Sequence, residues 1–157
     1  MNLNIRQEVA RDYAAVRGVT QRAFEGLAVS DQTEHRLVNR LRRSPYFVPE
    51  LSLVAEVDGQ IVGHILFTKV NIEKEGTPVK TLTLAPVSVL PAYQRKGIGG
   101  KLIEEGHRIA RSLGYDLIVL VGHEDYYPPL RLRTRFPLRS YLKPRSTRCQ
   151  LYGAFPE

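Results

Sequence analysis

The sequence predicts one α/β domain over residues 1–157, built on a mixed sheet with flanking helices. Three patterns carry this prediction: two amphipathic helical segments, a β-hairpin after them, and a strand–glycine turn–helix–strand unit after the hairpin. A hairpin pairs its strands antiparallel, whereas a strand–helix–strand crossover pairs them parallel. A length of 157 residues is typical of a single domain that buries its own core.

The two helices are expected before the first strand of the hairpin. Asp12 is a suitable N-cap for a helix that ends near Phe24, and a second helix should run from about Thr33 to Arg43. Both segments repeat apolar residues at helical spacing, which predicts one buried face each. The expected buried positions are Val16, Val19, Ala23 and Phe24 in the first helix and Leu37, Val38 and Leu41 in the second.

Asp58-Gly59 marks the hairpin, between the apolar segments LSLVAEV and IVGHILF. A two-residue type I′ turn requires positive φ at both positions, which Asp-Gly tolerates well. The period of two predicts which side chains share a face of each strand. These are Leu51, Leu53, Ala55 and Val57 on the first strand, and Ile61, Gly63, Ile65 and Phe67 on the second.

A third strand is expected over residues 80–89, after a polar break at residues 73–78. Pro86 lies inside this strand and cannot donate a ladder hydrogen bond, so we predict a bulge there or a departure from the neighbouring strand. A helix then follows the glycine turn, with Ile98, Leu102, Ile109 and Leu113 on its buried face. Gly114 should end that helix, and residues 116–121 form an apolar strand covered on both faces.

The glycine turn, residues 94–101, is the feature that carries chemistry. The free N–H groups at the start of the following helix, and the positive end of its dipole, would face the turn. Arg95, Lys96 and Lys101 add positive charge, so the expected ligand is a phosphate or pyrophosphate. A Walker A loop is excluded because Arg95 and Leu102 stand where it needs Gly and Ser or Thr. The alternative without a ligand is that the glycines only allow tight strand–helix packing.

The run V-x-P-x-x-Q-R-K-G-I-G-G resembles the coenzyme A signature Q/R-x-x-G-x-G/A of the GNAT superfamily of N-acetyltransferases. Val89, Pro91, Gln94, Gly97 and Gly99 all match it. The helices and hairpin upstream, and the strand DLIVLVGHEDYYP downstream, also resemble small bacterial members of that superfamily. The resemblance covers about residues 3–128. It implies a GNAT-like (acyl-CoA N-acyltransferase) fold, whose mixed, mostly antiparallel sheet is splayed at its centre.

The resemblance also implies a function, transfer of an acetyl group from acetyl-CoA to a primary amine by direct attack. In the family, the pyrophosphate binds to backbone N–H groups of the glycine loop, and the pantetheine arm binds along the splayed strand like an added strand. A backbone N–H near the thioester would stabilise the developing oxyanion. The implied cofactor-binding residues are Val87, Val89, Gln94, Arg95, Lys96, Gly97, Ile98, Gly99, Gly100 and Lys101.

Tyr127 matches, by position, the tyrosine that family members use as the acid for the departing thiolate. Tyr126 could replace it after a small shift, and either tyrosine could instead only pack a helix end. His123 is interpreted as a helix cap in preference to a proton relay. The third strand carries no acidic residue, so the general base stays unassigned. His64 is interpreted as a hydrogen-bonded hairpin residue, and His107 as a solvated residue of the helix after the glycine turn.

The net charge of +7 is concentrated at one end of the chain. Residues 1–127 carry 16 basic and 15 acidic residues, whereas residues 128–157 carry seven basic residues and one acidic residue. In the latter the apolar periodicity is lost, and residues 129–157 form an atypical basic segment with no clear strand pair. Two explanations stay open: a shifted reading frame after about Pro128, or a true extension that binds RNA, anionic lipid or an acidic protein.

The remaining expectations concern partners and location. The expected partners are acetyl-CoA and an amine acceptor. We expect no metal and no contact with a membrane, and binding of nucleic acid is disfavoured. A homodimer is an open alternative to a monomer. A single cysteine, Cys149, and the lack of an apolar run or signal peptide favour the cytoplasm. Two alternatives to an enzyme are a non-catalytic CoA-binding domain and a basic module that binds nucleic acid through the tail.

Overall fold

A single six-stranded sheet forms the centre of the computed structural model, which describes the chain except for residues 29, 124–148 and 155–157. Its strands follow one another in sequence order, and every neighbouring pair is antiparallel except β4 and β5. The predicted mixed, mostly antiparallel sheet is therefore confirmed. The strands are β1 (Leu3–Gln7), β2 (Phe47–Val57), β3 (Gln60–Lys74), β4 (Thr77–Val89), β5 (Leu117–His123) and β6 (Cys149–Ala154).

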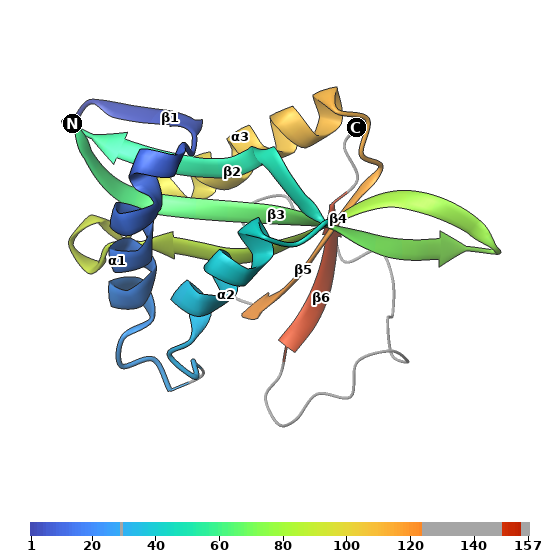
Figure 1. The fold of residues 1–157 in the computed structure, drawn as a ribbon, viewed down its shortest axis with the longest axis horizontal. Coiled ribbons are helices and arrows are strands. Elements are labelled where there is room, and N and C mark those ends of the chain that lie inside the picture. The colour runs from blue at the N-terminus through green and yellow to red at the C-terminus, as the bar shows by residue number, and fades with distance from the viewer. Residues whose placement is uncertain (29, 124–148, 155–157) are drawn as a thin grey trace.

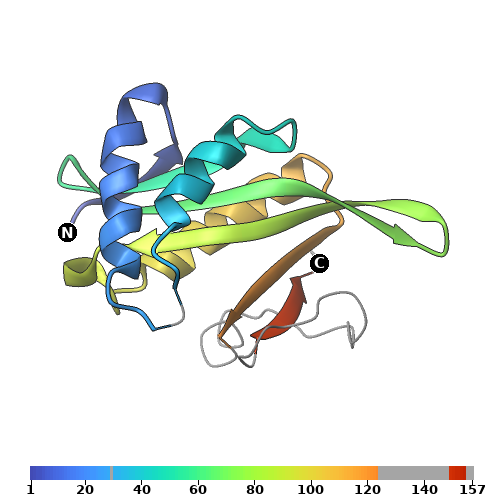
Figure 2. The same cartoon turned by 60° about the horizontal axis from the view of Figure 1, so that its bottom comes forward.

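Helices cover both faces of this sheet (Figures 1 and 2). The helices α1 (Tyr13–Phe24) and α2 (Glu34–Arg42) lie on one face, and α3 (Ile98–Ser112) lies on the other. Single turns of 3₁₀ helix, η1 (Ala10–Asp12) and η2 (Pro91–Tyr93), precede α1 and follow β4. The larger hydrophobic cluster packs α3 on the sheet, while a smaller one joins the two N-terminal helices to it through Val16, Val38, Val54 and Leu66.

The predicted hairpin is confirmed at its turn and on its first strand. Asp58 and Gly59 have φ values of 50° and 84°, as a type I′ turn requires. Leu51, Leu53, Ala55 and Val57 all belong to the cluster beneath α3. On the second strand, Ile65 and Phe67 also reach this cluster, but a register shift between Ala55 and Glu56 brings Val62 into it as well.

The expected polar break at residues 73–78 is wrong. The pairing of β3 and β4 continues through it, with Glu73 opposite Pro78 and Lys74 opposite Thr77. Glu75 and Gly76 form the turn, both with positive φ, in the same way as Asp58-Gly59. Polar side chains do not end the strands because this ribbon extends beyond the rest of the sheet, where water surrounds it (Figure 1).

Pro86 produces both of the expected irregularities in β4. Ile65 pairs with Val87 and Phe67 with Leu84, so Leu66 of β3 lies opposite the two residues Ala85 and Pro86. The parallel pairing with β5 stops at Leu84, one residue before this bulge. Beyond it, residues 85–89 have no strand on the β5 side within the described chain, and Figure 2 shows β4 and β5 diverging. The predicted central splay is present.

The buried face of α3 differs in part from the expected one. Ile98 and Leu102 are buried as expected, but Leu113 is 40% exposed, and Ile103, Gly106 and Ala110 are buried instead. Leu113 lies at the C-cap, where the helix has already left the sheet. Gly114 has a φ of +77° and donates its N–H to Arg111 O, so the predicted helix end is confirmed.

Asp12 stands at the N-cap of α1 but does not cap it with its side chain. Its carboxylate accepts hydrogen bonds from the Val9 N–H at 2.9 Å and from the Arg6 guanidinium at 2.7 Å. Arg6 also donates to Glu56 of β2 at 3.1 Å. The tertiary partner Arg6 therefore replaces the local capping bond, and it fastens the start of α1 to β1.

Two strands were not expected from the sequence. The short β1 lies on the outer edge of β2, and β6 pairs antiparallel with β5 from Ile118–Ala154 to His123–Cys149. The expectation of no strand in the tail is thus wrong for residues 149–154. A six-residue segment with no clear alternation gains its strand conformation from its partner, because the pairing with β5 is non-local.

Candidate active site

The end of β4, the turn after it and the start of α3 form the predicted ligand-binding segment. Arg95 and Gly97 have φ values of 60° and 78°, so the chain reverses twice in the left-handed region before the helix begins. Gly97 is the N-cap residue. Ile98, Leu102 and Ile103 are buried in the main cluster and hold the first turn of α3 against the sheet.

The first turn of α3 presents backbone donors. The first hydrogen bond of the helix is donated by Lys101 N–H to Gly97 O. The N–H groups of Ile98, Gly99 and Gly100 therefore precede the helical ladder, at the positive end of the helix dipole. Such a set of donors is a binding site for phosphate oxygens.

The side chains around these donors are basic and accessible. Arg95, Lys96 and Lys101 are all exposed, and residues 90–101 contain no acidic residue. The Nζ atom of Lys96 lies 5.1 Å from the centre of the Tyr93 ring, which keeps the ammonium group beside the turn. The charge of the segment is therefore suited to an anionic group.

Gln94 ties the turn to the strand before it. Its side-chain amide donates to the Val89 carbonyl at 3.0 Å. Val87 and Val89 pack their side chains on the main cluster, and both pair with β3, opposite Ile65 and Gly63. Since β5 has diverged, this end of β4 has an edge without a partner strand within the described residues. The predicted residues from Val87 to Lys101 thus lie along the end of β4, the turn and the start of α3, with the Ile98 side chain buried in the core.

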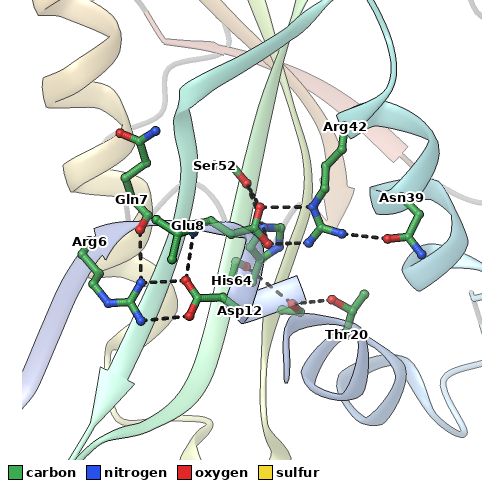
Figure 3. Close-up of polar contacts among 11 residues, drawn as sticks. Arg6, Gln7, Glu8, Asp12, Thr20, Asn39, Arg42, Ser52 and His64 are labelled. Atoms are coloured by element: carbon green, nitrogen blue, oxygen red, sulfur yellow. Dashed lines mark hydrogen bonds and ion pairs between the residues drawn. The ribbon is translucent and has the colours of Figure 1, made fainter. Parts of the chain in front are cut away.

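A buried polar cluster on the opposite face of the sheet was not anticipated (Figure 3). It joins Glu8, Arg42 of α2, Ser52 of β2 and His64 of β3. The Arg42 guanidinium forms a two-point ion pair with the Glu8 carboxylate and also donates to Asn39 Oδ1 at 2.7 Å. Ser52 Oγ donates to Glu8 Oε2 at 2.6 Å and lies 3.1 Å from His64 Nε2.

The protonation of this cluster follows from its contacts. Burial by itself would raise the pKa of Glu8, but the contacts with His64, Arg42 and Ser52 outweigh it and lower that pKa to about 2. Burial lowers the pKa of His64, against the favourable effect of Glu8, so the imidazole is neutral at pH 7. The cluster therefore contains one carboxylate, one guanidinium and one neutral ring.

Two hydroxyl groups extend this polar region toward β4. Thr20 Oγ1 of α1 lies 3.3 Å from Ser88 Oγ, and Ser88 Oγ lies 3.5 Å from the His64 carbonyl. Ser88 stands between Val87 and Val89, but its side chain points to the opposite face. No sequence motif identified these residues, because they come from separate elements. A polar residue inside an apolar strand, as in VGHIL, is the only local signal.

Both histidine interpretations need revision. His64 is hydrogen-bonded at Nε2, as expected, but Nδ1 has no partner among the described residues. His107 is not solvated: its ring packs edge-on against Phe67, with 6.4 Å between ring centres, and burial lowers its pKa. The expectation failed because the helix rotates this position toward the sheet.

Two of the predicted residues, Tyr126 and Tyr127, lie outside the described part of the chain. His123 is the last residue of β5 and pairs with Cys149. Across the described residues, no three His, Cys, Asp or Glu side chains are grouped as a metal site, and no helix has the length and apolar character that a membrane span requires.

Comparison with known proteins identifies relatives for most of the chain. Residues 14–130 match the model of the acetyltransferase (GNAT) family. The chain is 37% identical over 117 residues to the uncharacterized N-acetyltransferase YjhQ of Escherichia coli K12; this match covers 74% of the chain and 62% of YjhQ. It is also 30% identical over 124 residues to the uncharacterized N-acetyltransferase YhbS of that strain, covering 78% of the chain and 69% of YhbS.

The fold has close structural counterparts. A GNAT family acetyltransferase from Brucella melitensis, crystallised with acetyl-CoA, superposes with a TM-score of 0.80 at 37% identity, covering 98% of this chain and 88% of that one. E. coli YhbS, crystallised with CoA, superposes with a TM-score of 0.79 at 23% identity, covering 99% and 82%. The splayed sheet, the glycine turn and these matches agree with the resemblance seen in the sequence. The protein belongs to the acetyltransferase (GNAT) family.

Proposed function

We propose that the protein transfers an acetyl group from acetyl-CoA to a primary amine of a small molecule or protein. The observation that carries this proposal is the end of β4 that has no partner strand on the β5 side among the described residues and that leads directly into the donor-rich start of α3. Membership of the family supports it, as does the 37% identity to a Brucella melitensis acetyltransferase crystallised with acetyl-CoA.

The residues present fit the charged half of acetyl-CoA. The N–H groups of Ile98, Gly99 and Gly100 would bind pyrophosphate oxygens, and the left-handed Gly97 lets the backbone approach them without a side chain. Arg95, Lys96 and Lys101 would balance the phosphate charges. Gln94 acts indirectly, since its amide holds the turn against Val89.

The unpaired edge of β4 fits the other half. The pantetheine arm carries two amide groups, which can hydrogen-bond to backbone groups along residues 85–89 as an additional strand would. That arrangement would bring the thioester beside the N–H groups near Val87 and Val89. One such donor, fixed before the reaction, would stabilise the oxyanion that forms as the amine attacks.

The chemistry requires a neutral amine and an acid for the departing thiolate. The amine nitrogen bonds to the acetyl carbon, the carbon–sulfur bond breaks, and a proton moves from nitrogen to sulfur overall. We assign the acid role to Tyr127 on the family resemblance. Replacement of Tyr127 by Phe should lower kcat with little effect on the affinity for acetyl-CoA; an unchanged kcat would exclude this role.

Other features of the proposal concern the setting of the reaction. We propose a cytoplasmic enzyme of one domain that uses no metal and contacts no membrane. Nucleic acid is disfavoured as a partner because the excess charge lies in residues 128–157 rather than in the body of the domain. A homodimer remains an alternative to a monomer, and sedimentation at two protein concentrations distinguishes them.

The test of acetyl-CoA binding uses two matched glycine variants. Gly97 and Gly114 stand at opposite ends of α3, have φ values of +78° and +77°, and have no atom within 4 Å of an added Cβ. Replacement by Ala therefore strains both equally, by roughly 1–2 kcal/mol. By calorimetry, Gly97→Ala should weaken acetyl-CoA binding about tenfold or more, whereas Gly114→Ala should not. Equal weakening in both variants would contradict the proposed site.

Catalysis is tested separately from binding. Release of free CoA should be followed with a panel of amines: spermidine, tyramine, kanamycin, free lysine and a peptide with an N-terminal alanine. Turnover of any amine above the rate of hydrolysis supports the enzyme. Acetyl-CoA binding without turnover of any amine would instead favour the non-catalytic CoA-binding domain.

A further inference from the structure

The hydrogen-bond network assigns the tautomer of His64. Ser52 Oγ has one proton, which it donates to the Glu8 carboxylate at 2.6 Å. It must therefore accept from His64 Nε2 at 3.1 Å, so Nε2 carries the ring proton. Nδ1 of the neutral ring then carries no proton and has a lone pair that can accept one. The side chain is fully buried, and Nδ1 has no partner among the described residues.

A buried acceptor without a partner is costly, and such groups concentrate at functional sites. His64 lies next to the strand that is proposed to hold the thioester. His64 pairs directly with Ser88, the residue between Val87 and Val89 on the strand that would hold the thioester. Two hydroxyl groups, those of Ser88 and Thr20, lie on the same face as the polar cluster and contact each other at 3.3 Å.

We propose that His64 is the proton acceptor of the acetyl-transfer reaction, taking at Nδ1 the proton that the attacking amine loses. The proposal rests on the proposed function and fills the role of base that no acidic residue of β4 supplies. Because the ring is closed to solvent and no described hydroxyl lies within hydrogen-bond distance of Nδ1, the proposed step requires water to carry the proton to it. His64 is therefore a positioning residue, which holds the proton without touching the amine.

The step balances as follows. The amine nitrogen forms a bond to the acetyl carbon of acetyl-CoA and passes one proton to Nδ1. The carbon–sulfur bond then breaks, and its electron pair stays on sulfur. The thiolate takes a proton from Tyr127, the acid proposed above, and the proton held by the imidazolium is passed back through water to restore that hydroxyl, which leaves the amide, CoA and neutral His64.

Of the two charged groups near the ring, one favours a transient imidazolium and the other opposes it. Glu8 Oε1 lies 3.7 Å from Nε2 and stabilises the positive ring, while Arg42 of α2 opposes it. Within the part of the chain that the structure describes, the neighbouring strands and α1 contribute the neutral hydroxyls of Ser52, Ser88 and Thr20. The ring thus stays neutral at rest, and Glu8 keeps the protonated form accessible.

The test replaces His64 by Gln. The Gln amide can donate from near the position of Nε2, which preserves the contact with Ser52, but it has no basic lone pair at the position of Nδ1. With acetyl-CoA and the fastest amine of the panel, His64→Gln should lower kcat roughly 100-fold or more. Its affinity for acetyl-CoA by calorimetry should stay within about twofold of the wild type.

His107→Gln is the matched control. His107 is half-buried and is the other histidine of the described chain with a buried, unpartnered nitrogen, but it lies on α3 against Phe67, away from Ser88. Its replacement should leave kcat within about threefold of the wild type. A comparable loss in both variants, or no loss in His64→Gln, would overturn the proposal.

A pH profile separates proton acceptance from a structural role. The kcat of the wild type should fall in acid as one group is protonated, and His64→Gln should lack this acidic limb. If His64→Gln does not fold, a measurement on the wild-type protein still tests the proposal. The Nδ1 nitrogen resonance of His64 must then titrate with the pKa of the acidic limb, and a mismatch overturns the proposal. An inactive wild type would be a failure of the proposed function instead.

Discussion

At the scale of single residues, the protein has two kinds of charged side chain, exposed ones beside the glycine turn and buried ones that form ion pairs. Arg95, Lys96 and Lys101 are exposed on a turn and are free to meet an anion. Glu8 and Arg42 are buried and satisfied by each other. The first kind is visible as a motif, because its members are adjacent in the chain. The second depends on residues 34 positions apart in the sequence, and only folding reveals it.

Glu8 should stabilise the folded protein in a way that depends on pH. Its pKa is about 2 in the fold and 4.5 for an ordinary carboxyl, so the folded state favours the ionised form. The contribution is complete above pH 4.5 and is lost as the pH falls toward 2. Glu8→Gln should lower the free energy of unfolding at pH 7 by an amount on the order of 3 kcal/mol.

Urea unfolding at several pH values checks this expectation. The difference between wild type and Glu8→Gln should be constant between pH 5 and 7 and should shrink at lower pH. Glu105→Gln is a suitable control, since Glu105 forms an exposed pair with Arg108 on α3 and should contribute little. A difference that does not change with pH would show that the ion pair is not its source.

At the scale of elements, α3 and β3 approach each other closely at Gly106. A Cβ placed on Gly106 would lie 2.3 Å from the Phe67 ring, which is itself fully buried. Glycine is needed there for space rather than for its backbone freedom, because the residue lies in the middle of a regular helix. The close approach lets α3 pack directly on the sheet, which in turn sets the position of its N-terminus beside β4.

Gly106→Ala should therefore destabilise the protein, by roughly 1–3 kcal/mol, although alanine favours a helix over glycine. Gly18 of α1 provides the control, because nothing lies within 4 Å of its added Cβ. Gly18→Ala should be neutral or stabilising by up to about 1 kcal/mol. Calorimetric unfolding of both variants checks the pair; a stabilised Gly106→Ala protein would refute the packing argument.

Elements that are formed by interactions between residues close in the sequence could be predicted, whereas elements that depend on distant residues could not. The Asp58-Gly59 turn and the Gly114 helix end are local, and both appear as expected. The Glu75-Gly76 turn has the same conformation but was misread, because the flanking residues are polar and the ribbon needs no buried face. Apolar patterning identifies strands only where one face is buried.

At the scale of the whole molecule, the sheet depends on its last strand. β6 covers the outer edge of β5, and β5 supplies Ile118 and Leu120 to the main cluster. The strand comes from the basic segment that the sequence marks as atypical. Its backbone pairing gives part of this segment a structural role that does not depend on its charge.

Removal of residues 149–157 should expose the backbone donors and acceptors of β5. An uncovered edge strand pairs readily with other chains, so the shortened protein should unfold at a lower temperature and associate as its concentration rises. Light scattering and thermal unfolding measure the two effects. Removal of residues 155–157 alone serves as the control, and a shortened protein that stays as stable and monodisperse as the full chain would contradict this role for β6.

The sequence by itself determined the class of fold, the glycine turn and the family, because these depend on neighbouring residues and on a short-range period. It also located the splay of the sheet, since Pro86 lacks an amide donor wherever it is placed. Only the tertiary structure decided that β6 completes the sheet, that Asp12 binds Arg6 in preference to its own helix, and that His64 is buried beside Ser52 and Glu8. Those contacts join distant segments, and their energies exist only after the chain has brought the partners together.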